Sequence, residues 1–523
     1  MSRRGSLAAA AGIIAGITLL ARIVGFGRWL AFSHSVGATC VGQVYNTANL
    51  LPNVLYEVAA GGALAAVAVP LVARALITDR AAADRIASAL LTWAIAVLLP
   101  LAVLLALFAG PIASWMLGTN GCGDSAVSLA ATFVRIFAPQ VVLYGIGVVA
   151  GGVLQAHQRF VAAALAPLLS SLVVIASYLL FGRIGTGDPA AITPAAVAVL
   201  AGGTTLGVCA LSLPLLGVAA RAGIRLRPNW HFPPGVAAQA RRLAGAGIAA
   251  LIAQQLAVLI TAWVTNHRGG PGALTVYNYV QALYLLPYAV LAVPVATAAF
   301  PRLATGTAGT LGRSAAVVAV AGAASAALLI AVAPAAGRFF GALDAGRGGT
   351  GANALDGLAP SLTAFAPGVL GFGLTALLLR AAYARHITGG AAAAMCLGWA
   401  IAGLGPLLTL SEPADSSTVL VRLGVFSTIG MSIAAVALAA LLLRSGPGWS
   451  RLPWRTLTAG LLAAALGALG GRWCADRLAG GSLAAATLSA IVAALVALVV
   501  FAAVLAALDR PTFERLVVRR GRG

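Results

Sequence analysis

Residues 18–62 read TLLARIVGFGRWLAFSHSVGATCVGQVYNTANLLPNVLYEVAAGG, and this stretch decides how the chain is organised. Its apolar runs predict two helices that enter a lipid bilayer. Arg22 and Arg28 fall inside the first predicted helix, and Glu57 falls inside the second. An ionisable side chain at membrane depth is costly, so it normally faces a cavity or a partner and marks a functional path. The stretch therefore predicts a membrane hairpin that carries a binding site.

The composition is that of a membrane protein. Of the 523 residues, 61% are hydrophobic and only 9% are charged, whereas a soluble protein carries roughly 25% charged residues. All 33 basic residues are arginine, which indicates a GC-rich genome. This basic excess does not predict a nucleic-acid partner, because the cytoplasmic loops of membrane proteins collect positive charge. The lipid bilayer is the partner that the composition predicts.

Short motifs argue against an enzyme. The chain contains no GxxxxGK[ST], HExxH or GxSxG motif, so it lacks the usual signatures of an ATPase, a zinc protease and a serine hydrolase. The five cysteines are scattered, so their spacing predicts neither a metal site nor a disulfide framework. We therefore expect a membrane transporter without a cofactor, driven by the membrane potential or by an ion gradient.

The hydropathy pattern predicts an all-α polytopic protein with fourteen transmembrane helices, because a helical span needs ~20 mostly apolar residues. The predicted spans are 7–33, 41–76, 86–117, 126–156, 160–182, 192–220, 243–266, 274–300, 314–340, 358–384, 389–411, 417–443, 455–475 and 482–508. Pro52 and the Gly61-Gly62 pair predict a break in the second span, and Pro287 and Pro294 predict a bend in the eighth.

The distribution of arginine predicts the orientation. With both termini in the cytoplasm, 23 arginines fall on the cytoplasmic side, 6 fall outside and 4 lie within spans. Cytoplasmic loops are enriched in arginine and lysine in this way. We therefore expect a multi-pass protein of the bacterial cytoplasmic membrane with both termini in the cytoplasm.

An internal repeat predicts two six-helix lobes. VYNTANLLP at 44–52 recurs as VYNYVQALYLLP at 276–287, an offset of 232, and FAP at 137–139 recurs at 365–367, an offset of 228. An even number of helices gives both lobes the same orientation, and parallel repeats place a transporter's substrate site between them. The predicted parts are an N-lobe at 1–222, a C-lobe at 236–446, two further helices at 453–510 and a basic tail at 511–523.

Two charged residues of the hairpin lie near the middle of the bilayer in the predicted spans. At 1.5 Å per residue, Arg22 lies ~22 Å from the inner start of its span and Glu57 ~24 Å from the outer start of the next. Arg22 and Arg28 point ~120° apart on an ideal helix. An arginine suits phosphate because its planar fork donates two hydrogen bonds to adjacent oxygens. The alternative is an internal ion pair between Arg22 and Glu57, with Arg28 extended to the outer interface; for Glu57 we favour a structural or gating partner of Arg22.

Further polar residues lie near this hairpin. Asn49 and Asn53 in the second span suggest a wet cavity wall beside Glu57, although polar residues in spans also join helices. Arg135, near the outer third of the fourth span, either lines the same cavity or extends to the interface. The candidate substrate-binding residues are Arg22, Arg28, Asn49, Asn53, Glu57 and Arg135.

Three stretches resemble the lipid II flippases of the MurJ/MviN type. LLARIVGFGR at 19–28 is similar to the SR-x-x-G-F-x-R segment of that family. LLPN at 50–53, with the VP that follows it, is similar to the family's next motif. QRFVAAALAP at 158–167 is similar to the family's short connection between helices 4 and 5. The resemblance implies a fold of the multidrug/oligosaccharidyl-lipid/polysaccharide exporter (MOP) superfamily. It implies transport of undecaprenyl-pyrophosphate-linked peptidoglycan precursor from the inner to the outer leaflet, in cell-wall synthesis.

The resemblance also implies roles for particular residues. Basic residues of the family's first helix face the central cavity and hold the pyrophosphate, which carries over to Arg22 and Arg28. The helices at 455–508 would form a groove for the lipid tail, and cell-wall synthesis proteins are possible partners.

Two departures from the family pattern define the alternatives. Tyr56-Glu57 stands where the family usually has a basic pair, and Gln281-Ala282 aligns with an Asp-Arg pair. They indicate a divergent, actinobacterial-like member. The alternatives are a flippase for another lipid-linked oligosaccharide, a MATE-like small-molecule exporter and a non-transporting scaffold for cell-wall synthesis.

Overall fold

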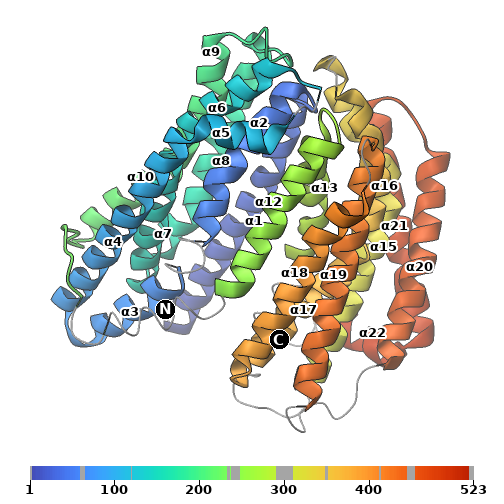
Figure 1. The fold of residues 1–523 in the computed structure, drawn as a ribbon. Coiled ribbons are helices and arrows are strands. Elements are labelled where there is room, and N and C mark those ends of the chain that lie inside the picture. The colour runs from blue at the N-terminus through green and yellow to red at the C-terminus, as the bar shows by residue number, and fades with distance from the viewer. Residues whose placement is uncertain are drawn as a thin grey trace. The chain divides into compact units, whose positions relative to one another are not determined.

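The computed structural model describes residues 3–58, 65–118, 121–232, 236, 248–289, 310–347, 351–410, 414–444 and 454–517. All regular structure in these ranges is helical (Figure 1), which confirms the predicted all-α fold. Ten of the described helices are long and apolar enough to cross a membrane, or eleven if the bent pair Asn353–Phe365 and Gly368–Ala384 is one span. Parts of the predicted spans 41–76 and 274–300 lie outside the described residues, so the count of fourteen stays a prediction.

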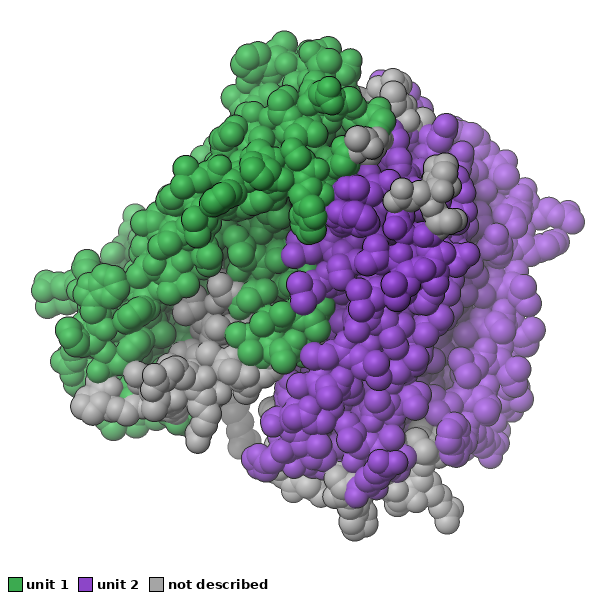
Figure 2. Space-filling model, viewed as in Figure 1, with its two compact units in different colours: residues 1–255 green, residues 256–523 purple. Residues whose placement is uncertain are grey.

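The chain forms two compact units, residues 1–255 and 256–523 (Figure 2). The helices of the first unit are α1 Arg3–Ser35, α2 Cys40–Leu55, α3 Ala65–Thr78, α4 Arg80–Leu107, α5 Ala109–Leu117, α6 Asp124–Phe137, α7 Gln140–Ala156, α8 Phe160–Ile184, α9 Pro194–Val197, η2 Ala198–Gly202 and α10 Gly203–Arg221. The unit boundary falls inside α12 Ile248–Arg268. The helices that follow are α13 Ala273–Pro287, α15 Thr310–Asp344, η4 Ala345–Arg347, η5 Ala352–Gly357, α16 Leu358–Phe365, α17 Gly368–Ala384, α18 Thr388–Thr409, α19 Ser416–Arg444, α20 Trp454–Arg477, α21 Leu483–Leu508 and α22 Arg510–Val517.

Aromatic pairs recur in the two units at the offsets of the sequence repeat. In the first unit the ring centroids of Tyr45 and Phe137 are 5.7 Å apart. In the second unit those of Tyr277 and Phe365 are 6.1 Å apart, and these residues follow at the same offsets of 232 and 228. The structure thus gives the repeated motifs the same packing partners within each unit.

α2 and α13 pass into the same kind of turn shortly after a proline, whereas the predicted break and bend extend into residues outside the described ranges and stay predictions. α2 ends at Leu55, three residues after Pro52, and a wider π-helical turn follows at 56–58. α13 ends at Pro287, and the same kind of turn follows at 288–289. A proline ring removes one helical hydrogen bond and pushes on the preceding turn. Gly61-Gly62 and Pro294 lie outside the described residues.

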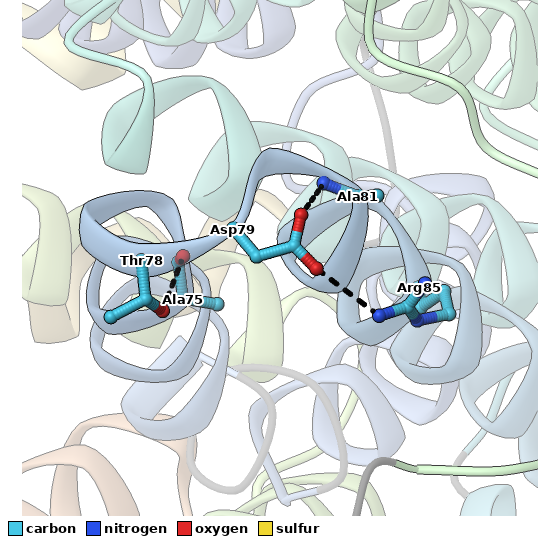
Figure 3. Close-up of polar contacts among 5 residues, drawn as sticks. All are labelled: Ala75, Thr78, Asp79, Ala81 and Arg85. Atoms are coloured by element: carbon cyan, nitrogen blue, oxygen red, sulfur yellow. Dashed lines mark hydrogen bonds and ion pairs between the residues drawn. The ribbon is translucent and has the colours of Figure 1, made fainter.

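The turn between α3 and α4 is held by Asp79 (Figure 3). Its Oδ1 accepts a hydrogen bond of 2.7 Å from the Ala81 N–H, and its Oδ2 lies 3.3 Å from a guanidinium nitrogen of Arg85. Thr78 donates to the Ala75 carbonyl at 3.2 Å and closes the last turn of α3. An aspartate at this position satisfies one of the free N–H groups at a helix start.

An extended segment runs along α4 in the first unit. The N–H groups of Arg225, Arg227 and Asn229 donate to side-chain oxygens of Asp84 (3.4 Å), Ser88 (3.1 Å) and Thr92 (3.0 Å), respectively. Residues two apart in an extended chain are ~6.6 Å apart, and residues four apart on a helix are ~6 Å apart along its axis. The spacing of every second N–H group in the extended segment thus matches the spacing of every fourth side chain on α4 closely enough for three successive bonds. These bonds hold residues 225–229 in an extended conformation along α4. We call residues 224–230 the strap.

One disulfide is present, which corrects the expectation drawn from cysteine spacing. Cys40, the first residue of α2, is bonded to Cys122, which precedes α6, with 5.6 Å between the Cα atoms. The two cysteines are 82 residues apart in the sequence. No local motif signals such a pair, because folding alone brings it together.

Small residues let α15, α20 and α21 lie side by side in the second unit (Figure 1). A Cβ atom at Gly467 would lie 2.7 Å from the Ala497 carbonyl oxygen, and one at Gly471 would lie 2.6 Å from that of Ala493. Arg338 of α15 donates to the Ala475 carbonyl at 2.8 Å and to the Ser489 hydroxyl at 3.0 Å, which joins α15 to both C-terminal helices. Close backbone approach at small residues is the usual way helices associate in membranes.

Candidate functional site

α1 presents its two interior arginines differently. The helix is continuous from Arg3 to Ser35, so the expected angle of ~120° between Arg22 and Arg28 holds. Arg28 is half-buried, whereas Arg22 is exposed. Only one of the two guanidinium groups is therefore partly enclosed by the first unit.

Tyr144 of α7 connects this region to α2. Its hydroxyl donates a 3.0 Å hydrogen bond to Asn53 Oδ1. Asn53 Nδ2 in turn donates to the Asn49 carbonyl at 2.7 Å. The Tyr144 ring lies against the Tyr56 ring, with 4.6 Å between centroids. The two predicted asparagines are thus held in place by a residue that the sequence analysis did not select.

The sequence contains a signal for Tyr144. It lies seven residues after the phenylalanine of the first FAP motif, and Phe372 lies seven residues after that of the second. Phe372 lies 4.5 Å from Tyr288 in the second unit, much as Tyr144 lies against Tyr56. The pair of aromatic residues is part of the repeat, and only the first unit carries a phenol hydroxyl at this position.

Arg28 lies close enough to Tyr144 and Tyr45 to interact electrostatically with both phenol groups. Within the described ranges its guanidinium makes no hydrogen bond and no ion pair. A guanidinium offers five N–H donors. The side chain is therefore available to an anionic ligand. We call Arg28, Asn49, Asn53 and Tyr144 the Arg28 cluster.

Two further features of the Arg28 cluster suit a bound ligand: open space beside Arg28 and a polar atom without a hydrogen bond to the described residues. Among the described residues, a Cβ atom at Gly25 or Gly27 would meet nothing within 4 Å, so α1 is open on both sides of Arg28. Asn49 Oδ1 is enclosed but accepts no hydrogen bond from any described residue. A buried carbonyl oxygen without a donor is costly unless a water molecule or a ligand supplies one.

The structure does not show the expected pairing of Glu57 with Arg22, and a gating role of Glu57 stays a prediction. Where the structure is described, no ion pair joins these residues, and both side chains are exposed. Glu57 falls in the π-helical turn at 56–58 after α2, and such a turn rotates the following side chains away from the α-helical direction. Glu57 does lie close enough to Tyr144 to interact with it electrostatically, so it borders the Arg28 cluster.

Arg135 lies apart from these residues. It is exposed on α6, whereas Phe133 and Phe137 of the same helix are fully buried against Tyr45. Residues two apart on a helix point ~200° away from each other. The structure therefore does not bring Arg135 to the Arg28 cluster. Among the described residues, no three or more His, Cys, Asp or Glu side chains gather as metal ligands.

Comparison with known proteins points to one family. Residues 32–479 match the family model described as lipid II flippase MurJ. A lipid II flippase MurJ from Burkholderia cenocepacia is 28% identical over 306 residues, which is 55% of each chain. A probable lipid II flippase MurJ from Rhizobium meliloti is 28% identical over 304 residues, which is 56% of this chain and 54% of the relative. The chain thus aligns with about half the length of these curated relatives.

Solved structures share the fold. A structure described as lipid II flippase MurJ in an inward closed conformation has a TM-score of 0.74 and 16% identity, and covers 97% of this chain and 99% of the other. An inward-facing multidrug resistance MATE family transporter of the MOP superfamily has a TM-score of 0.63 and 15% identity, and covers 83% of this chain and 98% of the other. At these identities the likeness is one of fold.

Proposed function

This chain belongs to the MurJ lipid II flippase family, and on that basis we propose that it moves lipid II, the undecaprenyl-pyrophosphate-linked peptidoglycan precursor, across the bacterial cytoplasmic membrane. The transfer runs from the inner to the outer leaflet. Both termini lie in the cytoplasm, as the arginine distribution predicts. The family match covers residues 32–479, which include all of α2 and α7. Arg28 lies in the part of α1 that precedes the match.

The guanidinium of Arg28, which makes no hydrogen bond or ion pair with the described residues, carries this proposal. Lipid II has a pyrophosphate next to its lipid tail, and a half-buried arginine with no partner among the described residues suits such a group. Charge-assisted hydrogen bonds from an arginine fork to phosphate oxygens are about twice as strong as neutral ones. In the proposed complex, Arg28 binds the pyrophosphate in the open space next to Gly25 or Gly27.

The neighbours of Arg28 position and complete the site. Tyr144 holds Asn53 through its hydroxyl, and Asn53 holds the α2 backbone at Asn49. The side chain of Asn49 accepts a hydrogen bond from the cargo or its water shell. Arg22 is a second basic group six residues away on the same helix. Glu57 borders the site and offsets part of its positive charge.

Transport would proceed by alternating access without a resident cofactor. The lipid tail stays in or near the bilayer while the pyrophosphate crosses bound to the protein. The membrane potential or an ion gradient supplies the energy, because one elementary charge gains ~2.3 kcal/mol per 100 mV. Cell-wall synthesis proteins would receive the cargo at the outer leaflet.

Depletion of the protein in its native host tests the cargo. The proposal predicts that lipid II accumulates in the inner leaflet and that wall synthesis slows. Mass spectrometry of the lipid extract identifies the intermediate that accumulates. Accumulation of a different lipid-linked oligosaccharide would replace lipid II as the cargo, and normal wall synthesis without accumulation would refute the proposal.

A further inference from the structure

The disulfide between Cys40 and Cys122 joins the start of α2 to the segment before α6. Its Cα separation of 5.6 Å lies in the range usual for disulfides. Both residues are buried, with 4% and 8% of their surface exposed. Gly121 and Gly123 on either side of Cys122 both have positive φ, at 82° and 76°, a conformation that glycine adopts without strain. The chain is thus shaped at Cys122 to turn this side chain toward α2.

Noncovalent contacts also fix the start of α2, but to a different segment. Thr39 caps the helix by accepting a 3.1 Å hydrogen bond from the Gly42 N–H. The Val41 N–H donates to the Gly187 carbonyl at 3.1 Å. These contacts join α2 to itself and to the loop after α8. The disulfide therefore supplies a separate attachment, to the segment between α5 and α6.

The disulfide also reinforces the pairing of α2 with α6. The two helices lie side by side (Figure 1), and Tyr45 of α2 packs against Phe133 and Phe137 of α6. From Cys40 to Asn53 is ~20 Å along the helix. One helix thus carries the disulfide at its start and Asn53 of the Arg28 cluster near its end, so a movement of its start is transmitted to Asn53.

The bond also identifies the compartment in which it forms. Disulfides persist in oxidising compartments and are rare in the cytoplasm. The arginine distribution independently places the turn between the first two spans on the outer side. We propose that an extracytoplasmic thiol–disulfide oxidoreductase oxidises Cys40 and Cys122, and that the resulting bond holds α2 in the position that the Arg28 cluster requires.

The disulfide of the oxidoreductase is the oxidant that accepts the electrons of the two cysteines. The two cysteine thiols lose two protons and two electrons as the sulfur–sulfur bond forms. The reaction passes through a mixed disulfide between one cysteine and the oxidoreductase. The electrons reduce the disulfide of the oxidoreductase to a dithiol, which takes up two protons. An enzyme of this class is therefore a transient partner of the newly made chain.

Thiol labelling of the membrane-inserted full-length protein tests whether the bond forms. After denaturation, wild type should gain two maleimide-labelled cysteines when a reductant is added, and the Cys40→Ser and Cys122→Ser variants should gain none. Cys209→Ser and Cys474→Ser remove thiols outside the disulfide and should keep the gain of two. Cleavage after arginine should release peptides 29–74 and 86–135 as one disulfide-linked species. No gain of label in wild type would overturn the proposal, as would the same bond yield in a host without extracytoplasmic thiol oxidase.

A second measurement tests what the bond does, and its transport readout rests on the proposed function. Wild type is folded first and then reduced, with reduction confirmed by the two additional labels, so a folding failure cannot explain the result. Reduction should lower lipid II transfer at least tenfold and lower the thermal midpoint, while Cys40→Ser should not respond. Unchanged transfer and midpoint in the reduced protein would overturn the holding role. If oxidised wild type transfers no lipid II, the proposed function fails, and the midpoint still decides the role of the bond.

Discussion

The Tyr144 hydroxyl donates to Asn53 Oδ1 at 3.0 Å, and this bond joins α7 to α2 close to the guanidinium of Arg28. It connects two segments 91 residues apart in the sequence. Both residues are partly buried, so water competes less for the bond than it would at an exposed surface. The arrangement fixes the polar wall of the Arg28 cluster before any ligand binds. Such preorganisation lowers the cost of ordering the site on binding.

Removing this hydroxyl should weaken transport without unfolding the protein. Tyr144→Phe keeps the ring against Tyr56 but deprives Asn53 Oδ1 of its donor. A hydrogen bond of this kind contributes about 1 kcal/mol, so lipid II transfer should fall about fivefold in reconstituted vesicles. Tyr383→Phe makes the same chemical change in the second unit and should transfer at the wild-type rate. Equal rates for Tyr144→Phe and wild type would remove Tyr144 from the site.

The open face of α1 should tolerate a small side chain but not a large one. A methyl group at Gly25 meets nothing within 4 Å, and alanine favours a helix over glycine by about 1 kcal/mol. Gly25→Ala should therefore raise the thermal midpoint, whereas Gly25→Leu should fill the space beside Arg28 and lower transfer at least tenfold. Gly217→Leu, on an exposed face of α10, is the matched control. Normal transfer by Gly25→Leu would show that the cargo does not use this face.

The strap should depend on Ser88. Its hydroxyl accepts from the Arg227 N–H at 3.1 Å and donates to the Arg225 carbonyl at 3.3 Å. Ser88→Ala leaves both strap groups without this partner and should destabilise the first unit by about 1 to 3 kcal/mol. Thermal unfolding in detergent measures the loss. Ser128→Ala removes a hydroxyl that bonds only within its own turn, and a loss of the same size there would refute the role of the strap.

Asp509 should make stability depend on pH. Burial acts to raise the pKa of this carboxyl, but hydrogen bonds from Thr456 and Thr512, together with the charge of Arg455, hold the pKa below its usual value. A lowered pKa in the folded state stabilises the protein above the ordinary pKa, and this stability is lost as pH falls through the folded value. Wild type should therefore melt higher than Asp509→Asn near neutral pH.

The comparison with Asp509→Asn should change in acid. The difference in thermal midpoint should shrink below about pH 4, the ordinary range of an aspartate, because a protonated aspartate resembles asparagine. A difference that stays constant with pH would show that the Thr456 bond of 2.7 Å stabilises through its geometry alone.

The parts of the fold and site that follow from local sequence were predictable. Hydropathy predicts the long helices because a bilayer requires apolar spans with internally bonded backbones. Arg28 and Asn53 stood out because charged and polar groups are rare in such spans. The aromatic pairs of the repeat were accessible in principle, since Tyr144 and Phe372 follow their FAP motifs at the same distance.

The remaining features depend on long-range packing or on backbone detail. Cys40 and Cys122 are 82 residues apart in the sequence and are brought together by the packing of the chain. Glu57 falls in a π-helical turn that follows α2, and periodicity arguments assume an unbroken α-helix. The strap contacts α4 from more than a hundred residues away in the sequence. Its bonds depend on the match between the residue spacing of an extended segment and that of a helix.

Lipid II transfer in reconstituted vesicles, compared between wild type and Arg28→Ala, tests the central claim most directly. A hydrogen bond to a charged group contributes about 1.5 to 3 kcal/mol, so the variant should transfer about ten to a hundred times more slowly. Arg135→Ala, which removes an exposed arginine outside the Arg28 cluster, should match wild type. Equal transfer by wild type and Arg28→Ala, at equal amounts of folded protein, would contradict the account.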